Sequence, residues 1–231
     1  MKTFEIAQVL KQVVKDMRVE EVHTFQQSLF APVLETMNRG VRIDQKKRGE
    51  FAVTLTQEIQ ERQNWINSAV GFDLNIQSNK QMQEFFYHDL KQKPVRDRKS
   101  GSISCGDEAL RKVAEREPLL RSLIRKISEL RSLHVFYSTF VTAPLDIDGR
   151  MRCSFNIGGT ETFRFSSRKN AFGSGMNMQN IPKGGDDDEL SLPNIRSLFI
   201  PDEGMEFFDI DLDSADLRTV VWESDEQEMK A

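Results

Sequence analysis

Three aspartates near the end of the sequence have a spacing that could bind a metal ion. They alternate with apolar residues in the segment FFDIDLD at 207–213. Because alternate side chains of a β-strand share a face, Asp209, Asp211 and Asp213 are expected to lie together. The residues expected on the opposite, core-facing side are Phe208, Ile210 and Leu212. Carboxylate oxygens are the ligands that Mg²⁺ prefers, so the pattern predicts a magnesium site. The alternative is a solvent-exposed strand edge where salt screens the repulsion between the charges.

Positive charge is concentrated in two places, although the net charge of the chain is −4. The first cluster is opposed only by Asp97 and consists of Lys91, Lys93, Arg96, Arg98 and Lys99. The second consists of Arg164, Arg168 and Lys169. Because phosphate contacts are local, segregated charge is more informative than the net charge. The segment 91–106 is also rich in Ser and Gly, which let backbone N–H groups approach phosphates. It is predicted to bind nucleic acid or, alternatively, to be a solvated charged loop.

The composition bounds the protein class. The chain has 231 residues, 38% hydrophobic and 29% charged, which is typical of a globular chain with one large domain or two small ones. No apolar run approaches the roughly 20 residues that a membrane span needs, and charge interrupts the N-terminus too early for a signal peptide. Cys105 and Cys153 lack a CxxC spacing, which suits a reducing compartment. The three histidines, His23, His88 and His134, lie too far apart in the sequence for a zinc pattern.

The first part of the chain is predicted to be helical. A helix over residues 23–38 should end at Gly40, because glycine favours helix C-termini. Asp44 is expected to cap a long helix that extends to residue 69. The buried stripe of this helix is predicted to be Phe51, Leu55, Ile59 and Ile66.

A second long helix is predicted to return alongside the first. Ser78, with Gln81 three residues later, predicts a capping box that opens a short helix ending near residue 90. Ser104 with Asp107 loosely repeats that signature before a helix at 108–117. The last long helix has nearly heptad apolar spacing over 120–134. Two long helices that enclose a short helical tip predict an antiparallel hairpin with packed apolar stripes.

The pattern changes to strands and loops near residues 146–149. Residues 151–157 alternate in polarity between glycines, which indicates a strand. A loop rich in Gly, Asn and Ser follows at 166–180, and an acidic turn is expected at 184–189. The aspartate-bearing strand is predicted over 206–213, and a helix should begin near Ser214.

Four segments of this second half occur in an order that is typical of one enzyme family. They are TFRFSS at 162–167, NMQNIP at 177–182, IRSLF at 195–199 and DLDSADLR at 211–218. They resemble, in the same order, the TGRLSS, NLQNIP, strand-forming IRxxF and DYSQxELR motifs of family A DNA polymerases. One such match would be weak evidence, but four in order at workable spacings are strong.

The helical half resembles the same family more loosely. Residues 33–44 are similar to the segment that enters the thumb, residues 74–82 to a segment within it, and 99–104 to its DNA-gripping tip. The resemblance implies an α+β fold, with a helical thumb, a long antiparallel helix pair with a small tip, followed by part of an antiparallel β-sheet palm. The implied divisions are an unassigned leader at 1–21, a thumb-like region at 22–147 and the N-terminal part of the palm at 148–231.

The resemblance also implies an activity and its cofactor. In this family two Mg²⁺ ions serve the attack of a primer 3′-hydroxyl on a deoxynucleotide. By its match, Asp211 would be catalytic and bind both ions, and the carbonyl of Leu212 would bind one. Asp216 stands where the family has a glutamate that excludes a 2′-hydroxyl, so its shorter side chain puts ribose exclusion in doubt. Lys183 would lie near the incoming triphosphate.

The implied partner is primer–template DNA. Arg164 would reach minor-groove acceptors that all base pairs share at the primer end. The NMQNIP segment would hold the nearby duplex through Asn177, Gln179 and Asn180. The residues expected to grip phosphates from the thumb are Arg131, Lys99, Ser100 and Ser104.

Nothing in the sequence resembles the family's fingers helix, its second palm motif or its 3′–5′ exonuclease acids. We therefore expect the chain to be inactive alone, and to need dNTP and the remaining C-terminal polymerase portion as partners. A cytoplasmic location in a bacterial or phage-infected cell is expected, with no membrane partner. The main alternative is a non-catalytic primer–template binding module. A single-subunit RNA polymerase relative is disfavoured by the 162–167 and 177–182 segments, and a purely helical scaffold leaves the second half unexplained.

Overall fold

The computed structural model describes residues 2–182 and 192–225 and divides into two compact units, Met1–Ile200 and Pro201–Ala231. Lys183 and the expected acidic turn at 184–189 lie outside the described residues. Helices dominate the first unit, and small antiparallel sheets complete it, so the predicted α+β class is confirmed.

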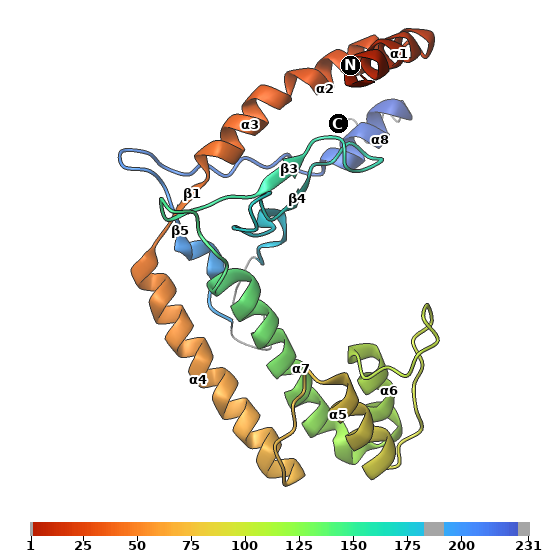
Figure 1. Ribbon diagram of the computed structural model, residues 1–231, viewed down its shortest axis with the longest axis vertical. Helices are drawn as coiled ribbons and strands as arrows, with labels where there is room; N and C mark the ends of the chain where they lie inside the picture. Colours follow the sequence, from red (N-terminus) through yellow and green to blue (C-terminus); the bar gives the residue numbers. More distant parts are fainter. Residues whose placement is uncertain (1, 183–191, 226–231) are drawn as a thin grey trace. The chain divides into compact units, whose positions relative to one another are not determined.

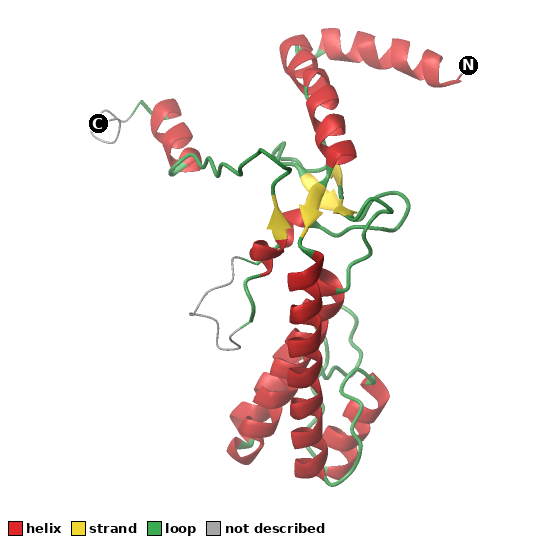
Figure 2. Ribbon diagram, turned by 90° about the vertical axis from the view of Figure 1, so that its left-hand side faces the viewer, coloured by secondary structure: helices red, strands yellow, loops and turns green. Residues whose placement is uncertain are grey.

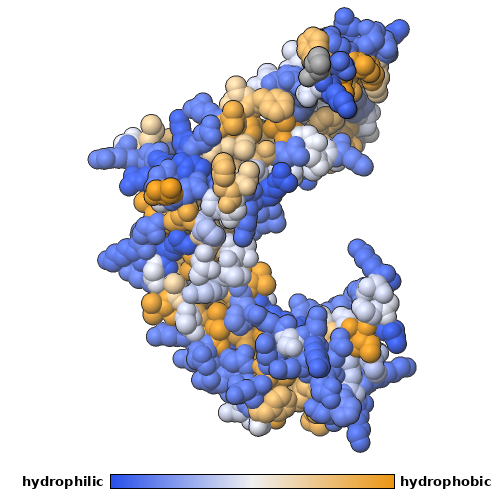
Figure 3. Space-filling view, viewed as in Figure 1, coloured by the Kyte–Doolittle hydropathy of each residue, from blue (hydrophilic) through white to orange (hydrophobic). Residues whose placement is uncertain are grey.

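The N-terminal part of the first unit consists of three successive helices. The single helix expected at 23–38 is instead two helices, interrupted at Leu29. Pro32 explains the interruption, because it cannot donate to the carbonyl of Ser28 and its ring clashes with that carbonyl. The helices contain no buried residues, and hydrophobic surface shows in the region of α3 (Figure 3). Their bounds are α1 Lys2–Asp16, α2 Glu20–Ser28 and α3 Phe30–Arg39.

The long helical hairpin follows, and its first helix begins where the sequence predicts. Helix α4 (Gln45–Val70) has Asp44 as its N-cap, and the carboxylate accepts a 3.0 Å bond from the amide of Lys47. Gly71, in the left-handed conformation at φ 84°, ends it. Ser78 caps α5 (Asn79–Gln83), which confirms the expected cap.

The rest of the hairpin contains one correction. Helix α6 begins at Asp107 with Gly106 as its N-cap, so Ser104 does not cap it. The backbone amide of Ser104 donates to Val95, and its hydroxyl accepts from the amide of Gly106, which holds Ser104 in the tip, two residues before the cap. The remaining elements are the π-helix η1 Glu84–Asp89, α6 Asp107–Arg116, the 3₁₀ helix η2 Pro118–Leu120, α7 Arg121–Phe136 and the π-helix η3 Tyr137–Val141.

The two long helices α4 and α7 pack side by side in opposite directions, as predicted (Figure 1). Of the predicted α4 stripe, Leu55 and Ile66 are buried, and Phe51 and Ile59 pack against the core. The hydrophobic core beneath the tip contains side chains of the short helices in addition to those of α4 and α7. Its fully buried members include Ile66, Met82, Phe86, Leu110, Ile127 and Leu130.

Two small sheets lie at one end of this hairpin (Figure 2). The strand expected at 151–157 is split, because the chain changes sheets after Met151. The backbone of Gly175 packs directly against the carbonyl of Arg152, where a Cβ would clash with that oxygen. The central strand of the first sheet, β1 (Val41–Ile43), pairs antiparallel with β2 (Arg150–Met151) and β5 (Phe199–Ile200). The second sheet pairs β3 (Ser154–Asn156) with β4 (Ser166–Arg168).

Short helical turns link these strands to a second hydrophobic core. The expected loop at 166–180 contains β4 and the 3₁₀ helix η4 (Met178–Asn180). In the segment 195–199, the 3₁₀ helix η5 (Ile195–Leu198) precedes β5. The second core includes Ile43, Leu55, Leu133, Phe136, Met151, Met176, Ile195 and Leu198. It joins one end of α4 and α7 to the sheet.

In the second unit, the prediction of an aspartate-bearing strand is wrong. Residues 206–213 form no strand, and no described strand pairs with them. The side chains predicted to face a core are exposed, at 82% for Phe208, 87% for Ile210 and 76% for Leu212. A strand needs a neighbour to accept and donate its backbone hydrogen bonds, and alternation in the sequence does not supply one. The helix expected near Ser214 is present as α8 (Ala215–Glu223).

Candidate nucleic-acid interface and metal-binding segment

The basic tip, residues 91–106, contains one carboxylate, which fixes the local backbone through hydrogen bonds. Asp97 accepts from the amides of Lys99 and Ser100 at 3.0 and 2.8 Å, and from the Ser100 hydroxyl at 3.0 Å. The bonds from Ser100 are the main reason that the pKa of Asp97 lies below its usual value. The two amides are thus already paired, so phosphate binding here would depend on exposed side chains, such as those of Arg98 and Lys99.

Arg131 lies at the base of the tip and is largely occupied there. Its guanidinium donates to the carbonyls of Cys105 at 2.7 Å and Ile76 at 3.2 Å, and it pairs with Asp107 at 3.4 Å. Its side chain is 20% exposed. These bonds tie α7 to the segments before α5 and α6. Arg131 therefore stabilises the helical hairpin, a role that its sequence match did not indicate.

Arg164 lies in the exposed connection between β3 and β4. This connection turns sharply, since Phe163 has φ 58° and its amide donates to the carbonyl of Thr160 at 3.2 Å. The Thr160 hydroxyl donates to the carbonyl of Arg164 at 2.8 Å. The ring of Phe165 packs against Phe155 of β3 with centroids 6.4 Å apart. The residues on each side of Arg164 are thus held in place.

The NMQNIP segment contacts the same connection. Asn177 caps η4 by accepting from the amide of Gln179 at 3.2 Å, and it also accepts from the hydroxyl of Ser167 in β4. The side-chain amide of Gln179 donates to the carbonyl of Phe165 at 2.8 Å. Asn180 is exposed at the end of η4. The structure thus brings together Arg164, Asn177, Gln179 and Asn180, which lie up to 16 positions apart in the sequence.

Arg152 forms an ion-pair network that the sequence did not reveal. It contacts Asp146 at 2.7 Å and Asp148 at 2.6 Å, and it donates to the carbonyl of Asn38 at 2.8 Å. Asp146 also accepts from Ser174. The bonds to Arg152 lower the pKa of Asp148 to about 2. Three segments distant in sequence meet at this guanidinium, and only the fold shows that they do.

A second ion-pair network surrounds the buried carboxylate of Glu129 on α7. Its carboxylate lies 3.0 Å from Arg125, 2.8 Å from Lys126 and 3.5 Å from Arg62. Burial acts to raise the pKa of Glu129, and the bonds from Lys126 and Arg125 outweigh it, so the pKa is lowered. The charged residues therefore support the α4–α7 contact rather than a ligand site.

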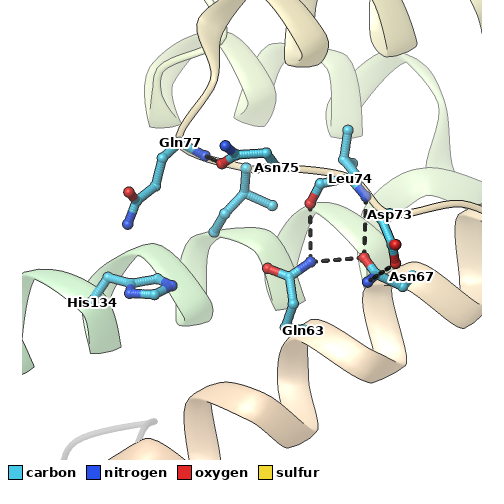
Figure 4. A pocket seen from close by; sticks show the side chains of 8 residues that line it. Gln63, Asn67, Asp73, Leu74, Asn75, Gln77 and His134 are labelled. Atoms are coloured by element: carbon cyan, nitrogen blue, oxygen red, sulfur yellow. Dashed lines mark hydrogen bonds between the residues drawn. The ribbon is translucent and has the colours of Figure 1, made fainter.

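A pocket of about 360 Å³ lies between α4, α7 and the segment after Gly71. Gln77 and His134 lie on one side of it and the amides of Gln63 and Asn67 on the other (Figure 4). Gln63 donates to the carbonyl of Leu74 at 2.9 Å and to Asn67 at 2.7 Å. Burial lowers the pKa of His134. These bonds fasten the segment to the long helix.

The second unit holds Asp211 and Leu212, which are predicted to bind metal, and Asp216, one of the two residues predicted to bind nucleotide. Asp211 and Leu212 are exposed, and Asp216 lies in the first turn of α8. Among the described residues, the one group of side chains that could jointly hold a metal ion is elsewhere, at Glu84, His88 and Asp89 on η1. Asp211 therefore belongs to no such group of three or more ligand side chains among the described residues.

Within residues 2–182 and 192–225, no helix is both long and apolar enough to cross a membrane.

Comparison with known proteins explains this combination of a helical hairpin, a basic tip and small antiparallel sheets. In solved structures, the fold is similar to the POL domain of Pol1 from M. smegmatis in complex with DNA primer-template and dNTP. The TM-score is 0.69 at 21% identity, covering 88% of this chain and 34% of that one. The fold is therefore that of a polymerase domain fragment. The sequence model of DNA polymerase family A matches residues 45–231, and the chain belongs to this family.

Curated relatives agree with this assignment. DNA polymerase I of Geobacillus stearothermophilus is 27% identical over 177 residues, which is 75% of this chain and 19% of that protein. DNA polymerase I of Treponema pallidum is 30% identical over 154 residues, 65% of this chain and 14% of that protein. The chain thus spans a fifth or less of the length of these relatives.

Proposed function

We propose that this chain is the thumb and the N-terminal part of the palm of a template-directed DNA polymerase. The proposed divisions are a leader at 1–21, the thumb at 22–147 and the palm part at 148–231. The observation that carries the proposal is the family match over residues 45–231, which includes both Arg164 and Asp211. The M. smegmatis POL domain, whose fold is similar, was solved with DNA primer-template and dNTP.

In the proposed palm part, Asp211 and Leu212 would hold Mg²⁺. Their carboxylate and carbonyl oxygens are the hard donors that this ion requires, so they fit it in kind. Two bound Mg²⁺ ions would stabilise charge on the attacking and leaving oxygens of nucleotidyl transfer. Asp216 would lie beneath the nucleotide sugar, where its short side chain would exclude a 2′-hydroxyl less strictly than glutamate. Lys183 would neutralise the incoming triphosphate.

In the first unit, the proposed DNA contacts are of two kinds. Arg164 would donate to minor-groove acceptors at the primer end, with Asn177 and Asn180 beside it and Gln179 supporting the same region. Backbone phosphates would be bound at the tip and its base, by Lys99, Ser100, Ser104 and Arg131. The exposure of the tip and of the Arg164 connection supports this division of roles.

We expect no primer extension by these 231 residues alone, because Asp211 would need the second metal-binding carboxylate and the fingers helix of the remaining C-terminal polymerase portion. The test is to mix the chain with a fragment that carries the fingers helix and second palm motif. Mg²⁺-dependent primer extension should appear. Asp211→Ala should lower it about a thousand-fold, as expected when several kcal/mol of metal-mediated stabilisation is removed.

Glu206→Ala is the matched control, since it removes an exposed carboxylate five residues before Asp211 in the same segment. It should retain most of the restored activity. Extension by the Asp211→Ala mixture at the unsubstituted rate would end the catalytic assignment. Comparison of ribonucleotides with deoxynucleotides in the same mixture tests the role of Asp216.

The alternative function is a DNA-binding module without chemistry, in which the basic tip that Asp97 organises would supply the main DNA contacts. Replacing the five cations of the 91–99 cluster with glutamine should weaken primer–template binding. The slope of log K against log salt should become shallower by roughly 0.9 for each phosphate that the tip no longer neutralises. Unchanged binding would remove the tip from the interface. A module of this kind would stay inactive with every complementing fragment.

A further inference from the structure

The backbone around Arg164 is fixed by two side chains that come from different parts of the sequence. The Thr160 hydroxyl donates to the carbonyl of Arg164 at 2.8 Å, and the Gln179 amide donates to the carbonyl of Phe165 at 2.8 Å. Two consecutive carbonyls are therefore held from two directions. Because a carbonyl fixes the plane of its peptide group, the orientation of the backbone on the C-terminal side of Arg164 is fixed with them.

Gln179 can hold this position because η4 is itself fastened to β4. The hydroxyl of Ser167 donates to Asn177 and accepts from the amide of Gln179 at 3.3 Å. Ser167 is paired with Phe155 across the two-stranded sheet. The side chain of Gln179 is thus anchored at its base before it reaches Phe165.

The connection that carries Arg164 has a tight course that needs such support. Phe163 adopts φ 58°, a conformation that is unfavourable for an aromatic residue. A Cβ at Gly159 would lie 2.5 Å from the hydroxyl of Ser166, so the chain passes close to β4 there. Strained loop conformations persist when surrounding bonds determine them. Loss of the bond to Phe165 would let the connection relax.

We infer that Gln179 and Thr160 are positioning residues for Arg164, and that Gln179 acts on DNA through Arg164 rather than by touching the duplex. This rests on the proposed function, and it deepens it by giving the TFRFSS and NMQNIP segments one shared task. The segment around η4 orients the arginine that tests the shape of the primer-terminal base pair.

The test measures primer–template affinity of the full chain by fluorescence anisotropy at one fixed salt concentration. Two duplexes are compared, one with ordinary purines at the primer end and one with 3-deazapurines, which lack the N3 acceptor. The unsubstituted chain should bind the second duplex about tenfold more weakly, as expected for one charge-assisted hydrogen bond. Arg164→Ala should abolish the difference between the duplexes.

Gln179→Met keeps the length of the side chain and removes the donor. If Gln179 acts through Arg164, the difference between the duplexes should fall below about threefold, since the arginine no longer aligns with its acceptor. If Gln179 touches DNA directly, the variant will bind both duplexes more weakly and the tenfold difference will remain. That second result would overturn the inference.

Thr160→Val provides an independent variant on the neighbouring carbonyl and should reduce the difference in the same way. Gln63→Met is the matched control, because it removes a glutamine bond to a backbone carbonyl far along the chain, at Leu74. It should leave the difference between the duplexes unchanged. An unsubstituted chain that binds DNA without distinguishing the duplexes would refute the role of Arg164 itself. A retained difference in both Gln179→Met and Thr160→Val would refute only their positioning role.

Discussion

The helical hairpin and the segment 201–225 differ in how closely their sequences resemble the polymerase family and in how deeply their side chains are buried. In the hairpin, whose sequence resembles the polymerase family loosely, core side chains such as Phe86 and Leu130 are fully buried. In the segment 201–225, whose DLDSADLR motif resembles the family closely, one hydrophobic residue, Val221, is buried among those described. Both regions contain Phe, Leu and Ile side chains. Whether such a side chain is buried therefore depends on the neighbours with which it can pack.

This difference shows that a motif can identify chemistry without specifying local structure. In the hairpin, caps, periodicity and long-range packing favour the same fold, and such agreement is what makes a sequence specify one structure. In the segment 206–213, alternation favours a strand, but among the described residues no partner strand accepts its hydrogen bonds. Its chemistry can be assigned by comparison with relatives, whereas its conformation depends on pairing.

The largest expected effect is the loss of folding stability when a buried side chain of the hairpin is truncated, compared with an exposed one of the segment 201–225. Leu130→Ala should lower the free energy of unfolding by about 2–5 kcal/mol, because it leaves a cavity in the hairpin core. Ile210→Ala should change it by less than about 0.5 kcal/mol, since the side chain is 87% exposed. Urea unfolding followed by circular dichroism measures both. An equally large loss for Ile210→Ala would mean that residues 206–213 are packed in the folded chain, and the comparison would fail.

A smaller effect is expected at Arg131, which distinguishes support of the hairpin from contact with DNA. Arg131→Met should destabilise the chain by about 1–3 kcal/mol, because the carbonyls of Ile76 and Cys105 lose a charged donor. Arg111→Met is the control, as Arg111 is exposed on α6 and pairs with Glu115 at only 3.9 Å. Thermal unfolding measures both variants. A stable Arg131→Met chain with weakened DNA binding would assign Arg131 to the interface instead.

Helix caps extend the comparison to local structure. Asp44→Ala should cost about 1 kcal/mol, because the carboxylate bonds the amide of Lys47 at the start of α4. Ser214→Ala should cost almost nothing, because Ser214 makes no side-chain capping bond to α8. The urea midpoints of the two variants give the comparison. Equal losses would show that α8 is capped in solution as firmly as α4.

Local signals in the sequence predicted much of the hairpin. Asp44, Ser78 and Gly40 act within a few residues of themselves, so their effects on helix ends can be derived without the fold. The apolar periodicity of α4 and α7 predicted which faces pack together. The break at Leu29 was missed although its cause, Pro32, is also local, because the apolar spacing on either side continues through it.

What the sequence could not supply were partners far along the chain. Arg152 reaches carbonyls and carboxylates from three segments, and nothing near position 152 marks it as their meeting point. Gln179 was predicted as a contact to DNA from its motif, and the motif did not indicate that its side-chain amide donates to the carbonyl of Phe165. The metal-binding and DNA-binding roles of individual residues remain proposals that motif matches support, since their ligands lie outside the chain.

The smallest effect concerns the acidic residues that join the hairpin to the strands, where ion pairs supplement the apolar core. Arg152 lowers the pKa of Asp148 from its usual 3.8 to about 2, chiefly through hydrogen bonds. A lowered pKa in the folded state means that this interaction stabilises the fold fully above about pH 4. The stabilisation is lost as the pH falls from 3.8 towards 2, because the unfolded state takes up the proton first.

The carboxyl ¹³C shift of Asp148, followed by NMR between pH 5 and 2, measures this directly. In Arg152→Met the midpoint should return towards the usual value, whereas Asp148→Asn should flatten the acid dependence of the urea midpoint in the same interval. The carboxylate is exposed, so the change in stability is expected to be smaller than that of the Asp44 cap variant. An Asp148 midpoint near its usual value in the unsubstituted chain would mean that Arg152 does not bind it in solution. The junction would then depend on its apolar core and on the bonds from Arg152 to Asp146 and to the carbonyl of Asn38.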